Sequence, residues 1–183
     1  MSMLRCFFEK RECDISALFH GLAVSRHDEA MRHFQRHPVV ALSFRGISTV
    51  SDAERAVRAS FAEHAYLRHH PALSPVDRMI YRQIKRQPLS YGLFELTRLV
   101  QQAHAERAVV LVDHYDRLSS VFARGVPLPW IYSRVFVGLR DNIHVEKAVL
   151  MDRSGLAERY VQCSRVWADR ARRHWTPRSL GAT

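Results

Sequence analysis

The stretch VVLVDHYDRL, Val109–Leu118, decides the fold class of this chain. Its first part is apolar and typical of a buried strand, and it ends abruptly in Asp113, His114 and, two positions later, Asp116. Ligands of parallel sheets bind at the carboxyl ends of the strands, so we expect Asp113 to lie beside such a crevice. A purely structural interpretation stays open, because an aspartate at a strand end often caps the following helix.

Two other short apolar runs, Val39–Phe44 and Lys147–Met151, are also typical of buried strands. The segments Pro75–Arg86 and Tyr91–His104 have the periodicity of amphipathic helices. Short strands that alternate with helices predict an α/β domain with a parallel sheet. A last helix, rich in arginine, is predicted over Leu156–Arg173.

The composition is that of a globular protein with one sizeable core. Of the 183 residues, 47% are hydrophobic and 25% are charged. The apolar runs are too short for a membrane span, and charged residues interrupt the opening segment too early for a signal peptide. The three cysteines have no CxxC spacing, so we expect reduced thiols and a cytoplasmic location.

The formal net charge of +10 comes almost entirely from arginine. Such a charge favours polyanionic partners, including nucleic acid, but it also suits a solvated arginine-rich surface. The densest group is Arg170, Arg172 and Arg173, which is the candidate polyanion contact. The alternative is an amphipathic helix that packs on the sheet while its arginines remain in water.

The eleven histidines do not form a recognised metal motif. HExxH is absent, and the two histidine-rich stretches contain no cysteine. We therefore predict exposed or helix-end histidines and no metal site. The histidines in question are His27, His33 and His37 in one stretch, and His64, His69 and His70 in the other.

Several stretches, in order, resemble the AAA-ATPase-like family of bacterial proteins, which often carry a C-terminal PD-(D/E)XK nuclease-like domain. They are MSMLRCFFEK at Met1–Lys10, LFHGLAVS at Leu18–Ser25, HPVVALSF at His37–Phe44, VVLVDHYDRL at Val109–Leu118 and LRDNIHVEKAVLMDRSG at Leu139–Gly155. The resemblance implies a three-layer P-loop NTPase fold of the ASCE/AAA-like type. It also implies Val109–Leu118 as the Walker B stretch, and ATP and Mg²⁺ as the family's cofactors.

This chain departs from the family pattern at the positions that serve nucleotide chemistry. The family's phosphate-binding loop precedes the segment that Met1–Lys10 resembles, and the chain contains no Gly-Lys pair. His114 stands at the position of the family's Walker B glutamate, and Met151 at that of a threonine. Asp113, Asp116 and Met151 are thus implied to be a degenerate nucleotide- and Mg²⁺-associated set. We expect no cofactor for this chain alone.

The resemblance also implies the sheet order 5-1-4-3-2, from which the strand that leads into the phosphate loop is missing. The remaining order is 4-3-2, in a domain that we place at residues 1–155, with an arginine-rich helix and tail at 156–183. Strand 4, Lys147–Met151, then has an unpaired edge. Such an edge predicts a protein partner or self-association.

The preferred hypothesis is a degenerate, non-catalytic AAA-ATPase-like domain, serving as an interaction module or surviving as a gene remnant. A second is an ATP-hydrolysing domain whose phosphate loop lies upstream of a mis-assigned start. A third is an arginine-rich nucleic-acid-binding protein, whose affinity would fall steeply with added salt.

Overall fold

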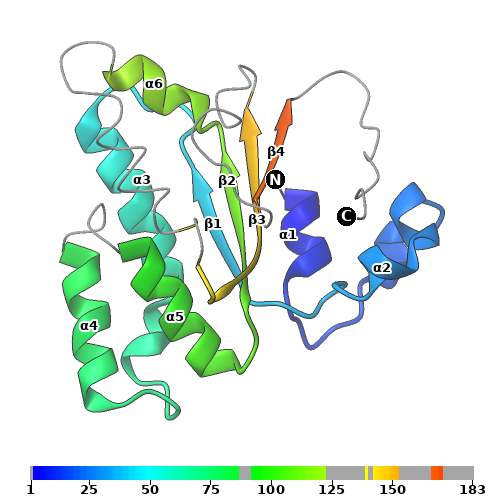
Figure 1. Cartoon of the computed structure of the whole chain (residues 1–183), viewed down its shortest axis with the longest axis horizontal. Coiled ribbons are helices and arrows are strands. Elements are labelled where there is room, and N and C mark those ends of the chain that lie inside the picture. The colour runs from blue at the N-terminus through cyan, green and yellow to red at the C-terminus, as the bar shows by residue number, and fades with distance from the viewer. Residues whose placement is uncertain (1, 87–91, 123–138, 140–141, 153–165, 171–183) are drawn as a thin grey trace.

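The computed structural model describes residues 2–86, 92–122, 139, 142–152 and 166–170. A parallel sheet of four strands organises them, and the strands lie in the order β1-β2-β3-β4 (Figure 1). The strands are β1 (Val39–Ser43), β2 (Ala108–Asp113), β3 (Val145–Asp152) and β4 (Val166–Arg170). The α/β class and the parallel sheet predicted from the sequence are therefore confirmed.

The helices are α1 (Ser2–Phe8), α2 (Asp28–Met31), α3 (Val50–Glu63), α4 (Pro75–Arg86), α5 (Gly92–His104) and α6 (Asp116–Phe122), with 3-10 turns η1 (Ser16–Phe19), η2 (Ala23–Arg26) and η3 (Ala65–Arg68). The predicted helix Pro75–Arg86 has the predicted bounds. The sequence pattern also predicts a helix over Trp130–Leu139, and this segment lies outside the described residues except for its last position. No helix in the described ranges has the length and apolar character that a bilayer span requires.

The sheet has two faces of unequal cover. Strand residues alternate between the faces, as the period of two dictates. Val40, Val110 and Leu150 belong to a large core that the helices α3, α4, α5 and α6 complete. Val39, Ala41, Val109 and Leu111 form a small core on the other face, where Leu4, Phe8 and Val149 pack against them. In the described chain, α1 is thus the helix that covers this second face (Figure 1).

The predicted final helix Leu156–Arg173 is wrong at Val166–Arg170, which form β4. β4 pairs with β3 in parallel, with Ala148 opposite Val166 and Asp152 opposite Arg170. The edge of Lys147–Met151 is therefore not unpaired, which corrects the three-stranded 4-3-2 sheet. The physical reason is that the main-chain N–H and C=O groups along β3 need partners, and the β-branched and aromatic start of this segment suits a strand.

The three predicted strands nevertheless hold their predicted mutual order. β2 lies between β1 and β3, with Asp113 opposite both Ser43 and Met151. This is the 4-3-2 arrangement that the resemblance implied. β4 occupies the next position, beside β3.

A capping box explains how α3 begins, and a close approach to Phe61 explains the glycine at the start of α5. Thr49 is the N-cap of α3: its side chain accepts a hydrogen bond from the Asp52 N–H at 3.1 Å, and Asp52 accepts one from the Thr49 N–H at 3.0 Å. This capping box satisfies N–H groups that have no partner inside the helix. At the start of α5, Gly92 lies so close to Phe61 that an added Cβ would come within 2.9 Å of the ring.

Candidate functional site

The candidate site lies at the carboxyl ends of the strands, as the sequence predicted for Asp113. Ser43, Asp113 and Met151 are register partners on β1, β2 and β3. Each stands at an even spacing from residues of the small core, so all three belong to the face that α1 covers. Asp113 is only partly exposed, at 23% of its side chain. The tertiary structure therefore brings Asp113 and Met151 together, though 38 positions separate them in the sequence.

His114 turns the chain sharply away from β2. Its φ of 55° lies in the left-handed region, which residues other than glycine seldom adopt. His114 Nδ1 lies 3.0 Å from Asp113 Oδ1, and the His114 carbonyl accepts a hydrogen bond from the Arg117 N–H at 3.0 Å. The imidazole is thus held against the neighbouring carboxylate by a tight turn.

Asp116 begins α6, so it does not belong to the strand-end row, which is the row of Ser43, Asp113 and Met151 at the carboxyl ends of the strands. A carboxylate in the first turn of a helix interacts favourably with the helix dipole. Tyr115, between the two acids, is buried in the large core at 1% exposure. The turn thus anchors α6 on the sheet, and a structural role accounts for the position of Asp116.

The residues around Asp113 do not by themselves fit a magnesium nucleotide. Mg²⁺ demands oxygen ligands in near-octahedral geometry, and Met151 offers only a thioether. Among the described residues, no group of three or more His, Cys, Asp or Glu side chains could hold a metal ion. The hydroxyl of Ser43 and one carboxylate remain as hard donors in the strand-end row. No catalytic step through ATP follows from this set.

The predicted polyanion contact is described only in part. Arg170 is the last residue of β4, and its main chain is in register with Asp152 of β3. It thus lies at the same end of the sheet as Asp113, where the strands have their carboxyl ends. Arg172 and Arg173 lie outside the described residues. The polyanion contact of this group stays a prediction.

The prediction of exposed or helix-end histidines is wrong for His37, and the rings of His33, His37, His64 and His70 form hydrogen bonds. His37 is buried, and its Nδ1 lies 3.2 Å from the Arg107 carbonyl, so Nδ1 donates and Nε2 accepts from His33 Nδ1 at 2.9 Å. Burial lowers the pKa of His33. His64 is buried as well, and burial followed by the charges of Arg5 and His104 lowers its pKa to about 4.

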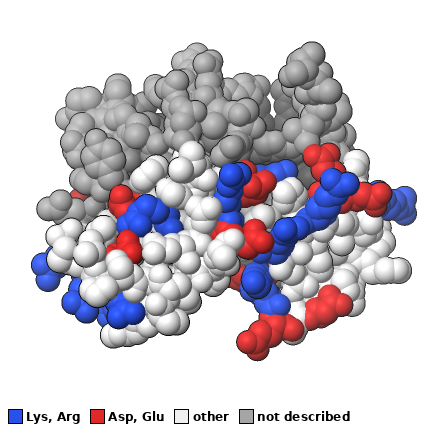
Figure 2. Space-filling model, turned by 60° about the horizontal axis from the view of Figure 1, so that its bottom comes forward, with Lys and Arg blue, Asp and Glu red and all other residues white. Residues whose placement is uncertain are grey.

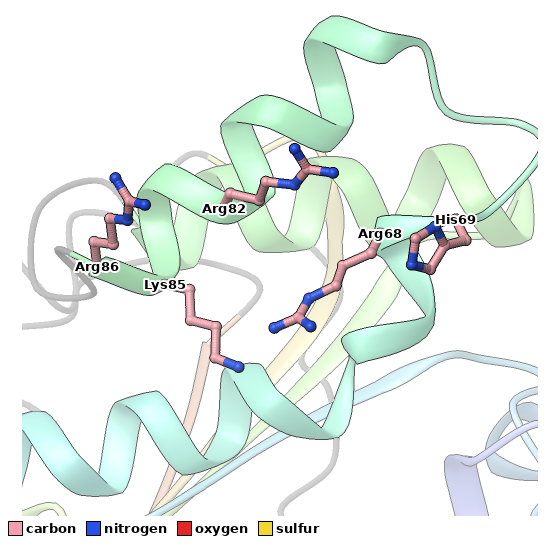
Figure 3. A pocket seen from close by; sticks show the side chains of 5 residues that line it. All are labelled: Arg68, His69, Arg82, Lys85 and Arg86. Carbon is pink, nitrogen blue, oxygen red and sulfur yellow. The ribbon is translucent and has the colours of Figure 1, made fainter.

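Sequence reasoning missed a basic pocket of about 540 Å³ on the helical side of the molecule. Figure 3 shows its lining, which is Arg68, His69, Arg82, Lys85 and Arg86. Three of these side chains follow the spacing i, i+3, i+4 on α4, which could have indicated a shared basic face. Arg68 reaches the same pocket from η3, and only the tertiary structure brings it there.

Comparison with known proteins gives one match. Residues 1–126 match the model of a family described as AAA-ATPase-like, predicted AAA-ATPase. The matched range includes Val109–Leu118 and ends before Met151. No curated protein and no solved structure matches the chain.

Proposed function

The chain belongs to the AAA-ATPase-like family, and we propose that residues 1–183 act as a non-catalytic member, built on part of a P-loop NTPase fold of the ASCE type. The parallel order β1-β2-β3, with an aspartate at the end of β2, supports this fold assignment. A family match over most of the chain supports the ancestry.

One observation is the main support for the proposal that this chain does not hydrolyse ATP. Asp113 has Met151 beside it on the neighbouring strand and His114 next to it along the chain. In the resembled family the position after this aspartate often carries a glutamate that acts on the attacking water. Here the next side chain is an imidazole that itself contacts Asp113. The sequence also offers no Gly-Lys pair to cradle the phosphates.

The test is nucleotide binding and hydrolysis by the purified chain. We expect no phosphate release from ATP with Mg²⁺, and no rise in melting temperature that depends on Asp113 when both are added. Asp113→Ala should behave like the unmodified chain, as should the control Asp28→Ala, which removes an exposed aspartate. A nucleotide-induced rise that Asp113→Ala abolishes and Asp28→Ala preserves would contradict the proposal.

The coding DNA before Met1 decides between this proposal and the alternative of an upstream phosphate loop. If that DNA encodes an in-frame strand followed by a glycine-rich Gly-Lys loop, the longer chain is the protein to assay. Hydrolysis by the longer chain that requires Asp113 would establish the alternative. An in-frame stop codon close to Met1 would remove it.

A further inference from the structure

The basic pocket is formed by two structural elements that meet at the flank of the molecule farthest from β4 (Figure 1). Arg68 ends η3, whereas Arg82, Lys85 and Arg86 lie in the second half of α4. In Figure 3 the side chains of Arg68 and Lys85 point into the space between α4 and α3. Both are partly buried, and Arg82 and Arg86 are exposed on the rim. The pocket thus has two cations inside and two at its mouth.

The positive charge of this pocket is not balanced by neighbouring acids. Every acid of α3 and α4 has an arginine partner elsewhere: Asp52 with Arg55, Glu54 with Arg58, Glu63 with Arg5, and Asp77 with Arg98. Within the described part of the chain, none of the four pocket cations forms an ion pair. Figure 2 shows basic groups gathered at the flank where α4 lies, while acidic and basic groups alternate over the opposite end.

Helix stability alone does not explain the arrangement. Basic residues in the last turn of α4 do interact favourably with the helix dipole. However, like charges at spacings of three and four residues on one helix repel each other, as Arg82 does with Lys85 and Arg86. Arg68 adds a further cation from η3, whose position the dipole of α4 does not require. A bound anion would relieve this repulsion.

The side chains that line the pocket indicate which kind of anion it would bind. Guanidinium groups bind phosphate oxygens through paired hydrogen bonds, and an ammonium group adds a compact charge. The lining contains no Phe, Tyr or Trp on which a base could stack, so recognition would rest on phosphate groups. Four cations around about 540 Å³ exceed what a single phosphate requires. We propose that this pocket binds a ligand that presents two or more phosphate groups in succession.

Two sources supply this chemistry: a free oligophosphate, and the backbone of a nucleic acid. The site is separate from Asp113, so the proposal does not depend on whether the family's nucleotide site functions. Binding is measured with inorganic triphosphate and, separately, with a single-stranded oligonucleotide. Titration calorimetry at low ionic strength, repeated at increasing NaCl, gives the affinity and its salt dependence.

The decisive variant is Arg68→Gln/Lys85→Gln, which removes the two partly buried cations. Its matched control is Arg26→Gln/Arg32→Gln, which removes the same charge from exposed arginines outside the pocket. We expect the pocket variant to weaken triphosphate binding about tenfold or more, because charged hydrogen bonds to phosphate are lost. The control should stay within about twofold, as expected for charges outside the pocket. Asp113→Ala should leave binding unchanged.

A variant of the rim keeps the test independent of folding defects. Arg82→Gln/Arg86→Gln changes only exposed side chains, and melting curves without ligand verify that every variant is folded. This variant should also weaken binding. Tighter binding of the oligonucleotide, with the same dependence on Arg68 and Lys85, would identify a nucleic-acid backbone as the source. Absence of binding by the unmodified chain, or an equal loss in the control, would overturn the proposal.

Discussion

Asp113 and Met151 are register partners at the carboxyl ends of β2 and β3, on the sheet face that α1 covers. A hard carboxylate and a soft thioether thus stand side by side where the resembled family has an aspartate and a threonine. Under the proposed non-catalytic function, the neighbours of Asp113, rather than its own placement, depart from the family pattern.

Restoring the family's residue types should not restore activity. In this chain His114→Glu/Met151→Thr places a second carboxylate and a hydroxyl beside Asp113, but no phosphate cradle is created. We expect phosphate release from ATP to remain at the background level of the assay. Turnover that appears in this variant and is lost on adding Asp113→Ala would show that the remaining residues suffice.

Gly92→Ala should destabilise the fold although alanine favours helices. The added Cβ meets the ring of Phe61 at 2.9 Å, and Phe61 is fully buried, so it has little room to move. We expect a net loss of about 1 kcal/mol in the free energy of unfolding, from overpacking of 1–3 kcal/mol reduced by the better helix propensity. Urea denaturation measures it.

A double-mutant cycle provides the control for Gly92→Ala. In a Phe61→Leu background the ring that blocks the Cβ is gone, so Gly92→Ala should become neutral or stabilising. An equal cost in both backgrounds would mean that the close approach to Phe61 is not the cause.

The capping box of α3 predicts a pH-dependent contribution from Asp52. Hydrogen bonds from Thr49 and Ser48 lower the pKa of Asp52 from 3.8 to about 2. Its contribution is therefore complete above about pH 4 and is lost as the pH falls through the folded-state pKa. Asp52→Asn should converge with the unmodified chain in stability at low pH. A constant difference down to pH 2 would contradict this.

Thr49→Ala tests the other half of the same box. Its hydroxyl accepts the Asp52 N–H at 3.1 Å, so its loss should cost about 1 kcal/mol of stability at neutral pH. Ser51→Ala is the control, because Ser51 is exposed and lies inside the helix rather than at its cap. Equal effects of the two substitutions would argue against the cap.

Buried His64 should make stability fall on mild acidification. The imidazole is 6% exposed, and its Nε2 has no hydrogen-bond partner among the described residues. Its pKa drops from 6.5 to about 4, so the unfolded chain takes up the proton first. Stability contributed by neutral His64 is intact above about pH 6.5 and declines as the pH falls toward 4, by up to about 3 kcal/mol.

His64→Phe should flatten this decline, because phenylalanine fills a similar volume without titrating. Denaturant midpoints at several pH values between 7 and 4 provide the measurement. The control His20→Gln removes an exposed histidine and should retain the full slope. An unchanged slope in His64→Phe would assign the acid sensitivity to the other histidines.

Local sequence patterns were enough to predict the helices and strands whose formation depends on neighbouring residues in the chain. The apolar run at Val39–Phe44 and the apolar start of Val109–Leu118 formed strands, and Pro75–Arg86 formed a helix with the predicted bounds. Asp113 was placed correctly at a strand end because the change from apolar to acidic residues is itself local. The family resemblance over the first 126 residues is likewise a property of the sequence.

Which segments pair with one another could be determined only from the tertiary structure. The segment Val166–Arg170 has enough helical periodicity to predict a helix. It forms a strand instead, because the main-chain N–H and C=O groups of β3 need hydrogen-bond partners. The meeting of Arg68 with Lys85 in one pocket depends on how η3 packs against α4. Contacts between distant segments decide these features, and no local pattern encodes them.

The sequence alone thus determined an α/β domain of AAA-ATPase-like ancestry with an aspartate at the end of its second strand. The tertiary structure alone decided that Met151 stands beside this aspartate, that β4 closes the side of β3, and that four cations share one pocket. The physical reason is that periodicity specifies which face of an element is apolar, whereas packing and unsatisfied main-chain groups specify which elements meet.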